Sequence, residues 1–152
     1  MIITIDGPAA AGKSTVARAL ARRLEYNYLD TGATYRAVTW KALENGVDFA
    51  DPAQLVDLAR ETQIRFEQGE DGLRVYCDGR DVTSDIRQPE VTKSIRYLAD
   101  QPPVRRAMIE IQSEYADGRD VVTEGRDQGT EVFPDADVKF YLDASVEARS
   151  RR

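Results

Sequence analysis

The chain contains no histidine and only one cysteine, Cys77. The missing histidine excludes a Ser-His-Asp catalytic site, a histidine general base and histidine metal ligands. A single cysteine cannot form an intramolecular disulfide, which suits a reducing compartment, and its alternating apolar surroundings are typical of a small core residue. Residues 1–5 form only a short apolar run before Asp6, which does not indicate a signal peptide or a membrane helix. We therefore expect a cytoplasmic protein.

The length and charge of the chain narrow its class further. Its 152 residues are the usual size of one compact domain, and 32% charged with 41% hydrophobic residues is a globular composition. The net charge of −6 argues against a general nucleic-acid binder. We expect a monomer that has neither a nucleic-acid nor a membrane partner.

The first part of the chain alternates predicted strands and helices, which is typical of a parallel α/β sheet. Apolar runs predict strands over 2–6 and 25–30, and helical spacing predicts helices over 13–24 and 33–46. Two further buried strands are predicted over 120–125 and 137–144. A last helix is predicted from Ser145, its N-cap, to Arg152.

The middle of the chain departs from this alternation. Asp51 and Pro52 predict the start of a helix, and residues 63–87 read as short antiparallel strands. The turns of these strands are predicted at residues 69–72 and at Asp78-Gly79. Two more helices are predicted over 89–100 and 104–118. The predicted fold class is therefore α/β, a parallel sheet flanked by helices with a small antiparallel insert.

The stretch GPAAAGKST, residues 7–15, matches the pattern G-x-x-x-x-G-K-[ST] between a predicted strand and a predicted helix. Its glycines permit backbone angles that aim several N–H groups at one anion, and the helix adds the positive end of its dipole. Lys13 should reach the β- and γ-phosphates of a nucleoside triphosphate, and the Ser14 hydroxyl should bind Mg²⁺. The residues predicted to hold the triphosphate are Gly7, Ala9, Ala10, Ala11, Gly12, Lys13, Ser14 and Thr15. The alternative is a glycine-rich turn before an ordinary helix.

Charged residues follow two of the predicted parallel strands, where ligands bind in open α/β sheets. Asp30 ends one strand, and Arg36, six residues on, suits a phosphate. Glu124 ends another as a candidate acidic partner of Mg²⁺, and Arg126 and Asp127 suit a phosphate and a base edge or sugar. The alternatives are a helix cap, a surface charge and a solvated turn. Arginines at strand ends suit phosphoryl transfer, which needs alignment and charge neutralisation.

Several motifs together resemble the bacterial-type cytidylate kinase family, also called CMP kinase, over all 152 residues. These motifs, in the family's order and spacing, are IDGPAAAGKST, YLDTGATYRAV, GRDVTSDIR, PEV, PPVRRAM, EGRDQGT and VFPDADVKFYLDAS. The loop alone is shared with many families, whereas DTGATYR and GRDVTSDIR are selective. The resemblance implies a P-loop nucleoside monophosphate kinase fold with a five-stranded parallel sheet, a mobile monophosphate-binding domain and a lid. It also implies transfer of the γ-phosphate of ATP, with Mg²⁺, to CMP or dCMP.

The resemblance also implies roles and domains. Residues 1–36 and 104–152 would form the P-loop core, and 37–103 the monophosphate-binding region with its insert at about 62–86. The catalytic residues would be Lys13, Arg36 and Arg126, and the metal ligands Ser14 and Glu124. The substrate-binding residues would be Thr31, Arg36 and Arg126 at the acceptor phosphate, with Arg96, Arg105 and Asp127 around the cytosine.

The chain departs from the family pattern in three respects. Arg96 stands where a serine is usual, Glu124 replaces an aspartate, and Gln128 replaces an apolar residue. Chains of the family also continue past residue 152 with lid arginines, further acceptor contacts and the fifth strand. If the chain ends at Arg152, we expect a truncated protein with weak or no kinase activity of its own. If these residues are part of a longer chain, this expectation does not apply. Another P-loop kinase with a small acceptor and a non-catalytic nucleotide-binding fragment remain as alternatives.

Overall fold

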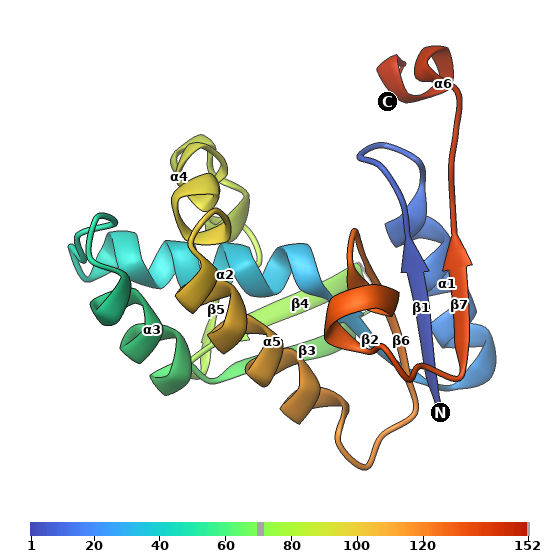
Figure 1. Ribbon diagram of the computed structural model, residues 1–152, viewed down its shortest axis with the longest axis horizontal. Coiled ribbons are helices and arrows are strands. Elements are labelled where there is room, and N and C mark those ends of the chain that lie inside the picture. The colour runs from blue at the N-terminus through green and yellow to red at the C-terminus, as the bar shows by residue number, and fades with distance from the viewer. Residues whose placement is uncertain (70–71, 152) are drawn as a thin grey trace. The chain divides into compact units, whose positions relative to one another are not determined.

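The structure, a computed structural model, describes residues 1–69 and 72–151 (Figure 1). The chain divides into two compact units. The first comprises Met1–Thr31 and Gln112–Arg152, and the second comprises Gly32–Ile111. No helix among the described residues has both the length and the apolar character that crossing a membrane requires.

A four-stranded parallel sheet forms the centre of the first unit. Its strands are β1 (Ile2–Asp6), β2 (Asn27–Asp30), β6 (Val121–Gly125) and β7 (Val138–Tyr141), in the order β2-β6-β1-β7. The inner strands β1 and β6 are buried along almost their whole length, as parallel strands covered on both faces must be. Helix α1 (Lys13–Leu24) contacts β1, β2 and β6. The predicted α/β class with a parallel sheet is confirmed.

The register of the sheet brings three acidic residues to one edge. Asp30 pairs with Glu124 across β2 and β6, and Asp6 pairs with Gly125 across β1 and β6. Asp6 and Asp30 end their strands and Glu124 is the residue before the end of β6, so the three lie at the carboxyl edge of the sheet, from which the phosphate loop also leaves β1. This edge is therefore where the residues of the first unit that the sequence singles out come together.

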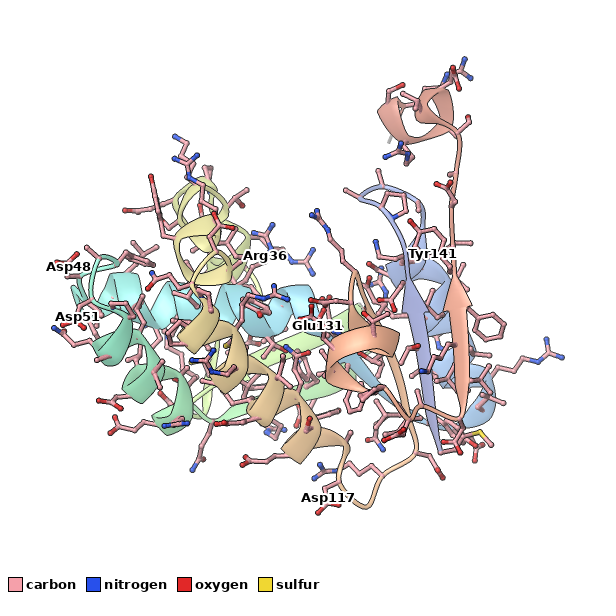
Figure 2. The ribbon with its side chains drawn as sticks, in the orientation of Figure 1. Arg36, Asp48, Asp51, Asp117, Glu131 and Tyr141 are labelled. Carbon is pink, nitrogen blue, oxygen red and sulfur yellow. The ribbon has the colours of Figure 1, made fainter. Side chains whose placement is uncertain are left out.

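One prediction about the sheet is wrong. Residues 137–144 are not a buried strand, because β7 spans only Val138–Tyr141 and Phe140 and Tyr141 are 51% and 73% exposed. The physical reason is its place in the sheet: β7 pairs with β1 on one side and, among the described residues, is an edge strand. Figure 2 shows the Tyr141 side chain on this strand.

Helices and a small sheet make up the second unit. The helices are α2 (Thr31–Glu44), α3 (Pro52–Glu61), α4 (Pro89–Ala99) and α5 (Pro102–Ala116), with a 3₁₀ turn η1 (Asp85–Arg87). The ends of α2 and α5 cross into the first unit. Strands β3 (Ile64–Gly69), β4 (Gly72–Cys77) and β5 (Arg80–Asp81) form an antiparallel sheet in that order. The antiparallel insert is therefore confirmed.

Two apolar clusters explain why α2 is buried on more than one side. Val38 and Ala42 pack with residues of α3, α4 and α5, including Leu55, Leu98 and Met108. Another part of α2 packs against the antiparallel sheet and its flanks. That cluster contains Ala33, Ala37, Val75, Cys77, Val82 and Ile86. A helix with apolar residues around its circumference is stable only when both sides are covered, so α2 is the core element of this unit.

Two local signals in the middle of the sequence, a helix start and a hairpin turn, are confirmed. Asp51, labelled in Figure 2, caps α3 by accepting hydrogen bonds from the N–H groups of Ala53 (3.0 Å) and Gln54 (3.2 Å). Asp78 and Gly79 have φ of 49° and 83°, as a tight hairpin turn requires. The predicted turn at 69–72 contains Glu70 and Asp71, which lie outside the described residues.

The last predicted helix begins at the expected residue and ends at Ser150. Ser145 caps α6 (Val146–Ser150) through a 3.2 Å hydrogen bond from the N–H of Ala148. The last residue of the predicted helix, Arg152, lies outside the described residues.

Substituting Gly7 with alanine should destabilise the protein strongly. Gly7 has a φ of 149°, and a Cβ atom there would overlap the carbonyl oxygen of Leu142. We expect Gly7→Ala to lower the free energy of unfolding by about 2 kcal/mol or more, measured by chemical denaturation of the complete protein. Gly46→Ala is the matched control, since Gly46 has a φ of 64° and an added Cβ atom there would meet nothing within 4 Å. It should cost about 1 kcal/mol. Equal losses for both variants would contradict the close approach at Gly7.

Candidate functional site

The phosphate loop lies between β1 and α1 and has the geometry of an anion cradle. Gly7, Ala10 and Gly12 have positive φ angles of 149°, 61° and 99°. Lys13 folds back across the loop and its Nζ donates to the carbonyl oxygen of Pro8 at 2.9 Å. No side chain of the described residues caps α1, whereas Asp51 and Ser145 cap α3 and α6. The first turn of α1 therefore presents its backbone N–H groups to a ligand anion.

Ser14 and Glu124 meet beside this loop. Ser14 Oγ donates to Glu124 Oε1 at 2.6 Å, although 110 residues separate them in the sequence. Glu124 is buried, and this burial raises the pKa of its carboxyl above the usual range, while the Ser14 hydrogen bond opposes the shift. A hydroxyl and a carboxylate are the oxygen donors that suit Mg²⁺, which takes one or two protein ligands and completes its shell with phosphates and water. The donor set therefore fits that ion.

Tyr28 is a further residue at this place, and sequence reasoning did not single it out. Its hydroxyl lies 3.5 Å from Glu124 Oε1, and burial together with the charges of Asp30 and Glu124 raises its pKa. Only its position two residues before the end of a strand could have marked it. In the structure it is buried and adds a third polar group to the Ser14–Glu124 pair.

Thr31, Arg126 and Asp127 lie at the same edge of the first unit. The buried Thr31 hydroxyl donates to the carbonyl oxygen of Glu124 at 2.8 Å and so ties the start of α2 to the end of β6. Arg126 is exposed and Asp127 is half-buried. The carbonyl oxygen of Asp127 accepts from Glu131 at 2.8 Å, which begins the single helical turn η2 (Gln128–Val132). A cation and a carboxylate thus stand on a short turn beside the metal-ligand candidates.

Asp6 holds this turn, although the sequence prediction assigns it no role. Its carboxylate accepts hydrogen bonds from the backbone N–H groups of Gln128 (2.9 Å) and Gly129 (2.8 Å), and its carbonyl oxygen accepts from the N–H of Leu142 at 2.7 Å. Asp6 is only 8% exposed. The signal that could have identified it is the one that marks Asp30 and Glu124, a carboxylate at the carboxyl end of a parallel strand.

Gln128, a departure from the family pattern, is accommodated by a buried polar network. Its Oε1 accepts from the Thr123 hydroxyl at 2.9 Å, and its Nε2 donates to Gln112 Oε1 at 3.3 Å. Gln112, Thr123 and Gln128 are each 2% exposed or less. The amide is therefore hydrogen-bonded at both ends, as a buried polar side chain requires.

Arg36, Arg96 and Arg105 belong to the second unit, so the structure does not relate them to the loop. Arg36 Nη1 donates to Thr92 Oγ1 at 2.8 Å and to the carbonyl oxygen of Ile86 at 3.3 Å, and Figure 2 labels it. The exposed Arg96 donates from Nη2 to the Tyr97 hydroxyl at 2.8 Å and lies over that ring. Arg105 is half-buried in α5. Their substrate contacts stay predictions.

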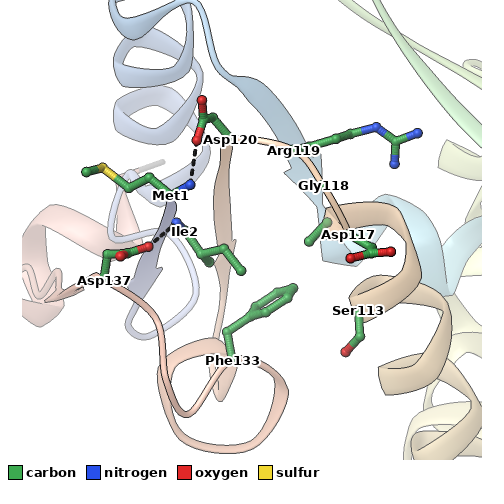
Figure 3. Close-up of a pocket in the computed structure, with 10 residues that line it drawn as sticks. Met1, Ile2, Ser113, Asp117, Gly118, Arg119, Asp120, Phe133 and Asp137 are labelled. Carbon is green, nitrogen blue, oxygen red and sulfur yellow. Dashed lines mark hydrogen bonds and ion pairs between the residues drawn. The ribbon is translucent and has the colours of Figure 1, made fainter.

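A cavity of about 600 Å³ lies at the opposite, amino-terminal edge of the sheet (Figure 3). There the amino-terminal ammonium group pairs with Asp120, and the N–H of Ile2 donates to Asp137 Oδ2 at 2.6 Å. Phe133 and Ala116 supply apolar lining. None of the residues predicted to bind nucleotide lines this cavity, so we assign the site to the carboxyl edge.

Comparison with known proteins agrees with these features. The sequence model of the family described as cytidylate kinase matches residues 3–152. The chain belongs to the cytidylate kinase family. It is 52% identical to a cytidylate kinase of Rhodopirellula baltica over 152 residues, which are 100% of this chain and 65% of the relative. It is also 52% identical to one of Pelotomaculum thermopropionicum over 151 residues, 99% of this chain and 67% of the relative.

The sequence matches cover only part of each relative, and the structural match is weak. The chain spans about two thirds of the length of these relatives, at 65% and 67%. The solved structure of TT1252 from Thermus thermophilus covers 99% of this chain and 69% of its own, at 24% identity and a TM-score of 0.42. The family assignment rests on the sequence matches alone.

Removing the Gln128 amide should destabilise the protein, even though an apolar side chain is usual at this position in the family. Gln128→Leu leaves the Thr123 hydroxyl and the Gln112 amide without their partner, and we expect a loss of about 1–3 kcal/mol in the free energy of unfolding. The triple variant Gln112→Leu/Thr123→Val/Gln128→Leu removes all three groups together. It should lose much less than the sum of the single variants, as measured by denaturation. Additive losses would show that the three side chains do not form one network.

Proposed function

We propose that the protein is a (d)CMP kinase, which transfers the γ-phosphate of ATP to CMP or dCMP and gives CDP or dCDP. The observation that carries the proposal is the contact of Ser14 with Glu124 beside a phosphate loop, in a chain of the cytidylate kinase family. Both named relatives are called cytidylate kinase. The family supports the substrate, and the site supports the triphosphate.

On the donor side, the loop would bind the ATP phosphates through the backbone N–H groups of residues 7–15 other than Pro8, which has none. Lys13 would exchange its bond to the Pro8 carbonyl for contacts with the β- and γ-phosphates. Ser14 and Glu124 would hold Mg²⁺, which supplies charge neutralisation on the phosphate oxygens when it is bound. Lys13 and the loop N–H groups would hold the γ-phosphoryl group in place while the bond from its phosphorus to the β-γ bridging oxygen breaks and ADP leaves.

On the acceptor side, a phosphate oxygen of CMP would form the new bond to the γ-phosphorus. Thr31, Arg36 and Arg126 would bind the acceptor phosphate, and Arg96, Arg105 and Asp127 would surround the cytosine. Two anions must approach each other in this reaction, so the arginines act by offsetting their repulsion and by fixing alignment. Residues 37–103 would form the monophosphate-binding region.

The proposal also covers the compartment and the oligomeric state of the enzyme. We propose a cytoplasmic monomer that acts on free nucleotides. The single cysteine, Cys77, is buried, and burial raises the pKa of its thiol to about 11. A reduced and unreactive thiol is compatible with that compartment.

The proposal predicts a substrate order that one assay can check. The complete protein, supplied with ATP and Mg²⁺, should release ADP with CMP or dCMP at a much higher kcat/KM than with UMP or AMP. Coupled ADP detection measures each rate. A preference for AMP or UMP, or binding of ATP without turnover by any acceptor, would overturn the proposal.

The variant Lys13→Ala sets the baseline for that assay. It removes the charge that the loop directs at the phosphates, and we expect kcat to fall on the order of a hundredfold to a thousandfold while the fold is retained. Arg22→Ala, in the last turn of the same helix, is the matched control and should keep its activity.

Arg36→Ala should raise the KM for CMP or lower turnover, because the acceptor phosphate loses a bidentate cation. We expect a change of about tenfold to a hundredfold, with the KM for ATP almost unaffected. Thr92→Ala removes the partner that holds the Arg36 guanidinium but keeps the charge, so its effect should be smaller. An unchanged dependence of rate on CMP concentration in Arg36→Ala would refute this role.

A further inference from the structure

Arg126 and Asp127 lie on a short turn, and Asp6 contacts this turn at its start and at its end. Its own backbone is paired with Gly125, the residue before Arg126, in the register of β1 and β6. Its carboxylate oxygens accept from the N–H groups of Gln128 and Gly129, directly after Asp127. Asp6 therefore contacts the chain on both sides of the exposed Arg126 and the half-buried Asp127.

The same residue is the last one before the phosphate loop. Asp6 is followed by Gly7, and its carbonyl oxygen accepts from the N–H of Leu142 at 2.7 Å. Its backbone is thus fixed on the β6 side and on the β7 side, and its side chain is buried. A short side chain on a fixed backbone has few rotamers, so the positions of its two carboxylate oxygens are determined by the sheet.

We propose that Asp6 is a positioning residue that fixes Arg126 and Asp127 relative to the phosphate loop. The inference rests on the proposed function, in which Arg126 binds the acceptor phosphate and Asp127 the cytosine. Phosphoryl transfer depends on alignment, and a displacement of the acceptor by about 1 Å can lower the rate by about a hundredfold. A carboxylate that holds two consecutive N–H groups is an effective means of preventing this displacement, because such charge-assisted hydrogen bonds are short and strong.

Two neighbouring side chains among the described residues hold other parts of this segment. The Gln128 side chain points to Thr123 and Gln112, so it anchors the turn to the core but leaves the backbone N–H groups to Asp6. Thr31 binds the carbonyl oxygen of Glu124, which precedes the turn. Within the described residues, the segment after Asp127 is therefore tied to the end of β1 by the Asp6 carboxylate.

The test compares Asp6→Asn with Asp137→Asn in the complete protein. Each variant changes one carboxylate oxygen that accepts a backbone N–H in the first unit, but Asp137 binds Ile2 at the opposite edge of the sheet. Asparagine in place of Asp6 puts an amide donor against one of the two N–H groups. We expect Asp6→Asn to raise the KM for CMP about tenfold or more and to lower kcat, with the KM for ATP changed less than about threefold. Asp137→Asn should keep all three constants.

Amide hydrogen exchange, measured by NMR, gives a second result that does not depend on activity. The N–H groups of Gln128 and Gly129 should exchange faster in Asp6→Asn than in the unsubstituted protein, and should not change in Asp137→Asn. Unchanged exchange would overturn the contact. Faster exchange with unchanged KM and kcat for CMP would overturn the positioning role. An unsubstituted protein without CMP kinase activity would overturn the proposed function instead, and the exchange rates would still decide whether Asp6 holds the turn.

Discussion

The first unit depends on one buried interaction, the hydrogen bonds of the Asp6 carboxylate to two consecutive backbone N–H groups. A carboxylate removed from water is costly unless donors replace its hydration, and here the turn after β6 supplies them. If this turn took another conformation, the Asp6 carboxylate would lose these two hydrogen bonds. The conformation of the segment after Asp127 and the burial of the end of β1 therefore require each other, and the phosphate loop begins at the next residue.

The depth of the two inner strands explains why functional groups gather at this edge. β1 and β6 are buried along almost their whole length, so only their last residues can present polar groups to a ligand. Asp6 and Glu124 stand at these ends, and Glu124 reaches Ser14 at 2.6 Å. Glu124 is held by the close-packed sheet and Ser14 by helix α1, which contacts β6, so both partners of this contact stand on regular elements.

Sequence patterns predicted those features that depend on residues a few positions apart. The Asp51-Pro52 helix start, the Asp78-Gly79 turn and the phosphate loop are of this kind. The contact of Asp6 with Gln128 joins residues 122 positions apart and has no local signal. The exposure of β7 depends on the order of the strands, which the local sequence of residues 138–141 does not determine. Arg36 and Arg96 could be named from motifs, but their contacts with Thr92 and Tyr97 depend on how helices pack.

The departure at Gln128 shows how one polar substitution constrains its surroundings. A Cβ atom on Gly125 would lie 2.7 Å from Gln128 Cγ and 3.1 Å from Thr31 Oγ1, so Gln128 and Thr31 fill the space beside that glycine. The side-chain amide of Gln128 is hydrogen-bonded to Thr123 and Gln112, and the backbone N–H of Gln128 donates to Asp6. Exchanging Gln128 for an apolar residue of similar volume would preserve the packing beside Gly125. It would leave the buried polar groups of Thr123 and Gln112 without this hydrogen-bond partner. The buried amide of Gln128 therefore requires Gln112 and Thr123 as hydrogen-bond partners. The three residues depend on one another and form one polar network.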